Sequence, residues 1–283
     1  MAILPKKSTG FDRCCSIDRF EIILTTASIR TGNYAALRCH PVIRSVKWTM
    51  MTKDYNPLED IATLKALIYE FKSNLPNRVD PASLTWTSKI PWKAVNLRET
   101  LLYRITELAE SAIDLYEKKN RMISAFIITR AVHETTALFY SFYTKLKQIT
   151  GEQSLGDFDD FLMKLLFGFK NDKEFPTAIN ILNAVDKLNK QIDSFRYIYD
   201  RLSEFCHPNY SGVFGAYAKI NKETGWVDFG TDVEKMSPMI GLHPLVASLN
   251  VFKYYYNEST ELIPTLIEIC ESCSKQNTKE DTM

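Results

Sequence analysis

The sequence predicts a mainly α-helical fold, a bundle of helices that carries one small β-hairpin. Three observations support this prediction. Apolar residues recur every three or four positions through long stretches after residue 57. Proline, glycine and asparagine stand where those stretches should begin or end. Only residues 213–230 alternate with a period of two, around the turn NKETG, as a β-hairpin does.

The chain of 283 residues is long enough to bury a large core, and it divides into three regions. Residues 1–50 show no sustained period, so we expect a poorly ordered extension there. Residues 51–90 should form an N-terminal helix and a proline-bearing linker. Residues 91–275 should form the helical bundle, with the hairpin near 213–230 inserted in it.

The expected helices follow in order along the chain. Asn56-Pro57 opens the first helix, and Pro91-Trp92 opens a longer one. Pro176 should lie in the first turn of the helix that reaches His207. A kink is expected at Pro264, because proline removes a backbone hydrogen bond. The predicted helical ranges are 58–73, 96–119, 121–149, 158–169, 176–207 and 243–272.

Composition and charge exclude several classes of protein. Hydrophobic residues make up 45% of the chain and the net charge is +1, so no overall field indicates nucleic acid or membrane. Residues 1–50 contain eight Lys/Arg against three Asp/Glu, which leaves the remainder mildly acidic. Six cysteines in a chain of this length indicate a reducing, cytoplasmic setting. The longest uncharged stretch, 236–252, is broken by proline and glycine, so we expect no membrane span.

The segment with the most useful side chains is Ser194–Tyr217, SFRYIYDRLSEFCHPNYSGVFGAY. Its apolar residues have helical spacing, and Pro208 should end the helix near His207. At 100° per residue, Arg201, Glu204 and His207 lie along one side of the last two turns. A cation, an anion and an imidazole therefore come together at the end of this helix.

Arg201 and His207 are separated by five residues, which resembles the Arg-x4–6-His motif of the HEPN superfamily of helical bundles. The run Arg130-Ala-Val-His-Glu134 also resembles a helix of bacterial families placed near HEPN. The resemblance implies a HEPN-like metal-independent ribonuclease of a toxin or defence type, with RNA as substrate, no cofactor, and a homodimer that pairs two motifs. Arg201, His207 and Glu204 would be the catalytic residues.

A second interpretation is a non-catalytic helical interaction or scaffold protein with a protein partner. In it, Arg201 and Glu204 form an intrahelical ion pair and His207 caps the helix. Leu202 favours this interpretation, because catalytic members usually have a polar residue there. Arg130, His133 and Glu134 lie on a very apolar helix, so we expect a supporting network that joins Arg130 and Glu134 to Arg201 and Glu204.

Metal binding finds little support in the sequence. Glu204-x-x-His207 has the helix spacing of di-iron bundles, but the chain has no second E-x-x-H. Cys270-x-x-Cys273 has no second cysteine pair for a zinc site. No phosphate-binding glycine loop and no G-x-S-x-G motif occurs. We therefore expect neither a metal nor a cofactor.

Overall fold

A computed structural model describes residues 55–80, 84–118, 121–230 and 236–280. The expected extension at residues 1–50 lies outside them. The described chain is mainly helical with one two-stranded sheet, which confirms the predicted fold class. Its elements, in order, are α1 (Pro57–Ser73), α2 (Ile90–Glu117), α3 (Met122–Glu152), α4 (Phe158–Phe167), α5 (Ile181–Asn189), α6 (Phe195–Cys206), α7 (Phe214–Tyr217), β1 (Ala218–Ile220), β2 (Val227–Phe229) and α8 (Met239–Glu280).

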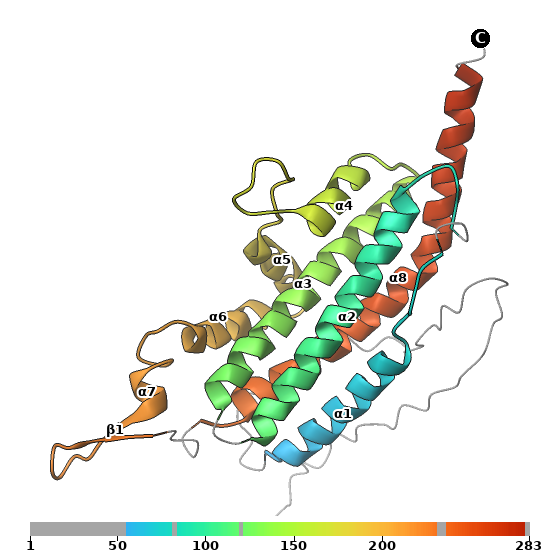
Figure 1. The fold of residues 1–283 in the computed structure, drawn as a ribbon. Helices are drawn as coiled ribbons and strands as arrows, with labels where there is room; N and C mark the ends of the chain where they lie inside the picture. The colour runs from blue at the N-terminus through green and yellow to red at the C-terminus, as the bar shows by residue number, and fades with distance from the viewer. Residues whose placement is uncertain (1–54, 81–83, 119–120, 231–235, 281–283) are drawn as a thin grey trace, which may run out of the picture.

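Three long helices form the centre of the bundle. Helix α3 packs along both α2 and α8, and the three lie side by side in Figure 1. Helix α1 covers the α2–α8 side, whereas α5 and α6 lie on α3. The largest fully buried side chains come from α1, α2, α3, α4, α6 and α8; they include Phe71, Phe126, Phe139, Phe142, Phe158, Phe195 and Phe252. One continuous core therefore joins α1 to α8.

Helix α1 belongs to this core. The side chain of Asn56 caps its first turn by accepting a hydrogen bond from the Leu58 backbone N–H at 3.1 Å. Phe71 is fully buried and contacts Phe252 of α8, with ring centroids 5.9 Å apart. Lys253 of α8 forms an ion pair with Glu70 at 2.6 Å. The N-terminal helix is thus held by both apolar packing and a half-buried ion pair.

A buried ionic cluster joins α2 to α8. Arg98 and Glu99 are almost fully buried and form an ion pair. The guanidinium lies 3.6 Å from the ring centroid of Tyr256, and it donates to the hydroxyls of Ser259 and Thr260. The Tyr256 hydroxyl donates to Glu99 at 2.8 Å. Both buried charges are therefore satisfied, as such groups must be.

The helix predicted over 176–207 is two helices. Pro176 lies in the loop before them, where its carbonyl accepts a hydrogen bond from Phe169 at 2.9 Å. Helix α5 begins only at Ile181, capped by the Asn180 side chain. The chain then breaks before α6 at Ser194, which has a positive φ of 68°. This left-handed conformation cannot continue a right-handed helix.

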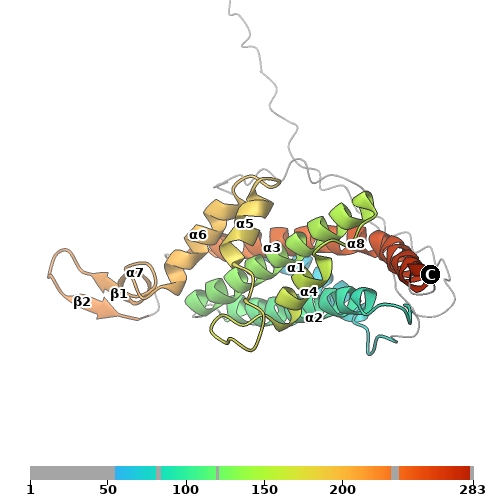
Figure 2. The same cartoon turned by 90° about the horizontal axis from the view of Figure 1, so that it is seen from above.

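The predicted hairpin is present but shorter than 213–230. Residues 214–217 form the short helix α7, and each strand has three residues. The antiparallel register pairs Ala218 with Phe229 and Ile220 with Val227. Figures 1 and 2 show α7 and the hairpin extending away from the bundle beyond α6.

Helix α8 is longer than the predicted 243–272 at both ends. It begins at Met239 and includes both Pro244 and Pro264. A Cβ atom at Gly241 would lie 1.8 Å from the Tyr116 hydroxyl oxygen, so only glycine lets α8 approach α2 and α3 this closely. The C-terminal turns of α8 continue past the ends of the neighbouring helices (Figure 1).

Candidate functional site

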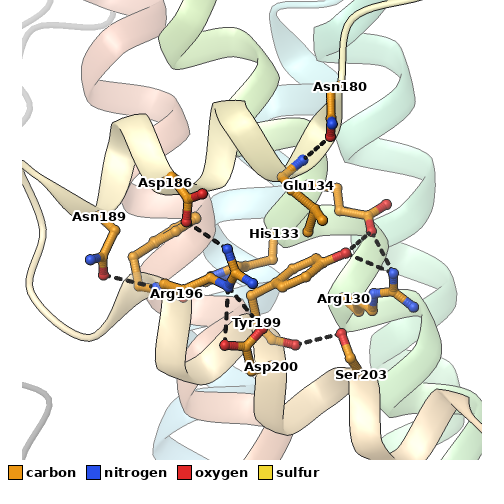
Figure 3. A network of polar contacts seen from close by, with 12 residues as sticks. Arg130, His133, Glu134, Asn180, Asp186, Asn189, Arg196, Tyr199, Asp200 and Ser203 are labelled. Atoms are coloured by element: carbon orange, nitrogen blue, oxygen red, sulfur yellow. Dashed lines mark hydrogen bonds and ion pairs between the residues drawn. The ribbon is translucent and has the colours of Figure 1, made fainter.

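The candidate site is the C-terminal half of α6 and the turn after it. Helix α6 begins directly after the break at Ser194, and the Asn189 side chain of α5 accepts a hydrogen bond from the Arg196 backbone N–H at 2.9 Å. The Arg196 guanidinium forms ion pairs with Asp186 at 2.6 Å and Asp200 at 2.8 Å (Figure 3). These contacts fix α6 against α5.

One face of α6 is buried against α3. Phe195, Ile198, Tyr199 and Leu202 are buried at the spacing of a helical stripe, as predicted. Phe205 continues the stripe and contacts Phe126 of α3, with ring centroids 4.9 Å apart. The opposite face, which carries Arg201 and Glu204, consequently faces away from the core.

The helix ends where the sequence predicts. His207 is the C-cap residue and is extended, with φ −83° and ψ 145°, as expected for a residue before proline. Its carbonyl accepts a hydrogen bond from the Asn209 N–H at 2.8 Å. Position 212 requires glycine, because a Cβ atom there would lie 2.3 Å from the His207 carbonyl oxygen. A tight turn over residues 207–212 thus holds the end of α6.

The three predicted catalytic residues are accessible. His207 is exposed, and Arg201 is half-buried beside Tyr197, with 3.4 Å between the guanidinium and the tyrosine hydroxyl. Glu204 is exposed and accepts a hydrogen bond from the Asn209 side chain at 2.7 Å. Among the described residues, no ion pair links Arg201 to Glu204. The intrahelical pair of the scaffold interpretation is therefore not formed.

The expected network contains different residues. Arg130 and Glu134 form an ion pair on α3 at 3.1 Å, and the buried Tyr199 of α6 points its hydroxyl toward both of them (Figure 3). The Tyr199 hydroxyl accepts from Arg130 at 2.7 Å and donates to Glu134 at 3.2 Å. No hydrogen bond or ion pair in the described part of the chain joins Arg201 or Glu204 to this group. Tyr199 therefore takes the place that we predicted for Arg201 and Glu204 in this network.

The Arg130 group is held firmly in its charged state. Partial burial lowers the pKa of Arg130, but its contacts with Tyr199, Cys206 and Glu134 more than offset this and raise the pKa overall. Burial raises the pKa of the Cys206 thiol despite the neighbouring guanidinium. The thiol donates to the Leu202 carbonyl at 3.2 Å. Cys206 is thus a protonated packing residue here and not an activated nucleophile.

His133 lies on α3 beside Arg130 in sequence but faces the core. Its Nε2 lies 2.9 Å from the Phe195 carbonyl oxygen, and its Nδ1 lies 2.9 Å from the Ser248 hydroxyl of α8. The carbonyl can only accept, so Nε2 carries the proton and Nδ1 accepts from Ser248. The ring stacks on Phe195 at 3.5 Å. His133 therefore joins α3, α6 and α8, and it is not hydrogen-bonded to Arg130 or Glu134.

Complete burial lowers the pKa of His133 to about 4, although the Phe195 carbonyl acts in the opposite direction. The imidazole is consequently neutral at neutral pH. It cannot serve as a proton-transfer group for solvent-borne substrates from this buried position. Its contribution is to the packing of α6.

The described residues offer no cluster for a metal ion and no helix for a membrane span. The described residues contain no cluster of three or more His, Cys, Asp or Glu side chains with metal-binding geometry. Burial raises the pKa of the Cys270 thiol, whereas a metal-binding cysteine needs a thiolate. Within the described ranges, no helix is both long and apolar enough to span a bilayer.

Comparisons of the chain with models of protein families, with curated proteins and with solved structures found no match. The resemblance to HEPN proteins accordingly depends on the residues themselves. The relevant feature is an arginine and a histidine on the exposed side of one helix end.

Proposed function

We propose that the C-terminal end of α6 binds the phosphate backbone of RNA and cleaves it without a metal, with Arg201 and His207 as catalytic residues. One observation carries this proposal. The Arg201 guanidinium is hydrogen-bonded to the neutral hydroxyl of Tyr197 and forms no ion pair within the described ranges, and Glu204 one turn later is hydrogen-bonded to Asn209 instead. The positive charge of Arg201 is therefore not neutralised locally and remains available to an anionic ligand.

The chemistry follows from the two side chains. Imidazole accepts and donates protons near neutral pH, so His207 takes the proton from a ribose 2′-hydroxyl. The 2′-oxygen attacks the adjacent phosphorus, and the bond from phosphorus to the 5′-oxygen breaks, which leaves a 2′,3′-cyclic phosphate. Arg201 stabilises the negative charge that develops on the phosphoryl oxygens.

The leaving 5′-oxygen needs a proton as well. Each chain offers one histidine at this helix end, so a second copy supplies the general acid. Glu204 acts through Asn209 as a positioning residue, because their hydrogen bond ties the helix to the turn that orients His207. Requirement for a 2′-hydroxyl makes RNA the substrate, since DNA lacks it.

The test is an RNA cleavage assay in EDTA with single-stranded and structured RNA. His207→Ala and Arg201→Ala should each abolish cleavage while the far-UV circular dichroism spectrum and Tm stay unchanged. Arg196→Ala is the matched control, because this arginine lies on the same helix but is paired with two aspartates. A 2′-deoxy substitution at the cleaved position should block the reaction. Equal activity of His207→Ala and wild type would refute the proposal.

The second candidate is the non-catalytic interaction protein. It is favoured by the exposed apolar surface of the segment after α6, where Tyr210 and Trp226 are about three-quarters exposed. A wild-type protein that leaves every RNA intact, yet binds another protein through this segment, would establish this function. The same variants distinguish the two candidates. If the protein is a non-catalytic interaction protein, Arg201→Ala and His207→Ala should not change its binding to the partner protein.

A further inference from the structure

Two exposed tyrosines flank Arg201 along the end of α6. Tyr197, one turn earlier on the same face of the helix, is 48% exposed, and its hydroxyl lies 3.4 Å from the Arg201 guanidinium. Tyr210, in the turn after α6, is 73% exposed. The hydrogen bond from the Asn209 side chain to Glu204 holds this turn beside the last turn of the helix. One open aromatic ring therefore precedes the guanidinium along the helix, and another follows it.

The Tyr210 ring is supported by its neighbours. The Gly215 N–H donates a hydrogen bond to the Tyr210 carbonyl at 2.7 Å, which closes the turn. A Cβ atom at Gly215 would lie 3.1 Å from Cε1 of the Tyr210 ring, so the ring lies close against the glycine. The Phe214 ring of α7 lies alongside, with centroids 6.1 Å apart and planes inclined by 28°. The ring is thus held in position while most of its surface stays open to solvent.

A guanidinium between open aromatic rings matches the chemistry of a nucleotide strand. Arginine binds phosphate, and an aromatic ring stacks on the face of any nucleobase. A purely apolar partner would bury the Arg201 guanidinium without a counter-charge, which is costly. A nucleic acid supplies the counter-charge and the stacking surface together. The observations therefore favour a nucleic acid over an apolar protein surface as the ligand of these rings.

The proposed cleavage also needs a base that has left its stack. The attacking 2′-oxygen and the leaving 5′-oxygen must stand roughly in line on opposite sides of the phosphorus atom, as in other phosphoryl transfers. A regular A-form helix does not place them so, and the nucleotide at the cleaved bond has to unstack. An aromatic side chain that receives the unstacked base compensates for the stacking that is lost.

We infer that Tyr210 and Tyr197 stack on the two bases that flank the phosphate bound by Arg201, so that the substrate is a single-stranded stretch of RNA. The inference rests on the proposed function and adds to it two residues that contact the substrate without taking part in proton transfer. Phe214 and Gly215 are positioning residues, because they hold the Tyr210 ring. Stacking does not distinguish one base from another, so little sequence preference is expected.

Binding is tested separately from cleavage with a short, fluorescein-labelled 2′-O-methyl RNA, which keeps its bases and phosphates but has no 2′-hydroxyl to attack. In fluorescence anisotropy, Tyr210→Leu should weaken the binding of this strand by about 10-fold, because stacking on one base is lost. Tyr197→Leu should have an effect of similar size. Tyr210→Phe keeps the ring and should bind as the wild type does. Tyr69→Leu, which removes a 75% exposed tyrosine from α1, is the matched control and should leave the affinity unchanged.

A strand of abasic nucleotides of the same length makes the test specific for stacking. It has phosphates but no bases, so wild type and Tyr210→Leu should bind it equally weakly. Equal affinity of wild type and Tyr210→Leu for the 2′-O-methyl RNA overturns the inference, and so does an effect of Tyr210→Leu that persists with the abasic strand.

The outcome for the proposed function is read independently from the cleavage of ordinary RNA. Cleavage that depends on His207, with no effect of either tyrosine on affinity, leaves the proposed function standing and removes the stacking residues. Base-dependent binding through Tyr210 without any cleavage removes the proposed reaction and leaves the stacking residues assigned. A wild type that binds neither strand overturns both, and the exposed tyrosines then belong to a contact with a protein partner.

Discussion

The neutral, fully buried His133 should make the stability of the protein strongly dependent on pH. Its imidazole is 0% exposed and bridges Phe195 of α6 and Ser248 of α8. Its pKa is about 4 in the folded state against 6.5 for a free histidine side chain. The unfolded chain therefore binds a proton more readily between these two values, and protonation favours unfolding.

The sign and size of the effect follow from this difference. The stabilisation that neutral His133 gives is complete above pH 6.5 and is lost as the pH falls toward 4. One pKa unit corresponds to about 1.4 kcal/mol, so the total loss is on the order of 3 kcal/mol, of which about 2 kcal/mol is lost by pH 5. Other titrating groups add their own dependence, so a comparison with a matched variant is needed.

His133→Gln provides that comparison, because glutamine can donate to the Phe195 carbonyl and accept from Ser248 but does not titrate. Urea unfolding of both proteins should be measured from pH 8 to pH 4.5. The unfolding free energy of the wild type, measured relative to that of the variant, should fall by about 2 kcal/mol between pH 8 and pH 5. His207→Gln, at an exposed site, should preserve the wild-type curve. A wild-type-to-His133→Gln difference that stays constant with pH would refute the assignment of a neutral buried imidazole.

Three further substitutions test the packing. Glu99→Ala should cost about 3–5 kcal/mol in urea unfolding, because it leaves the buried charge of Arg98 unpaired; a loss below about 1 kcal/mol, as for a surface pair, would contradict this. Tyr199→Phe should cost about 1.5–3 kcal/mol, since its hydroxyl bonds to both members of the ion pair on α3; an unchanged Tm would contradict it. Gly212→Ala should lower stability by about 1–3 kcal/mol through a clash with backbone oxygen atoms. Gly151→Ala, which meets nothing within 4 Å, is the control and should not destabilise.

Much of the bundle could be predicted because its helices have local signals. Helices α1 and α2 each combine a regular apolar stripe with a recognisable start, at Asn56-Pro57 and Pro91. The break between α5 and α6 had no such signal. Leu188, Ile192 and Phe195 keep helical spacing through it and are all buried, so the apolar pattern continues across a chain that turns. Ser194 adopts its left-handed conformation without any glycine or proline to indicate it.

Some features of the candidate site could also be predicted from the sequence, and others could not. The end of α6 at His207 could be read from Pro208, because proline restricts the residue before it. The partners of Arg130 and Glu134 could not be predicted from the sequence, because the neighbouring helix carries both a tyrosine and an arginine that could bond to them. The buried pair Arg98–Glu99 was missed altogether. A signal did exist: Arg98 stands four residues after the buried Ala94, on the apolar stripe itself, which is where a charge must find a partner.

The arrangement on α3 explains how α6 can be fixed while its end remains open. His133 fixes the start of α6 through the Phe195 carbonyl, and the Arg130–Glu134 pair fixes its middle through Tyr199. All these contacts lie on the buried face, and Arg201 and His207 make none of them, so these two residues are not needed to hold α6 in place. Substitutions on the two faces should therefore separate: those at His133 or Tyr199 change the free energy of unfolding, whereas those at Arg201 or His207 change ligand chemistry alone. This separation is what allows a loss of activity at the exposed end of α6 to be assigned to function and not to folding.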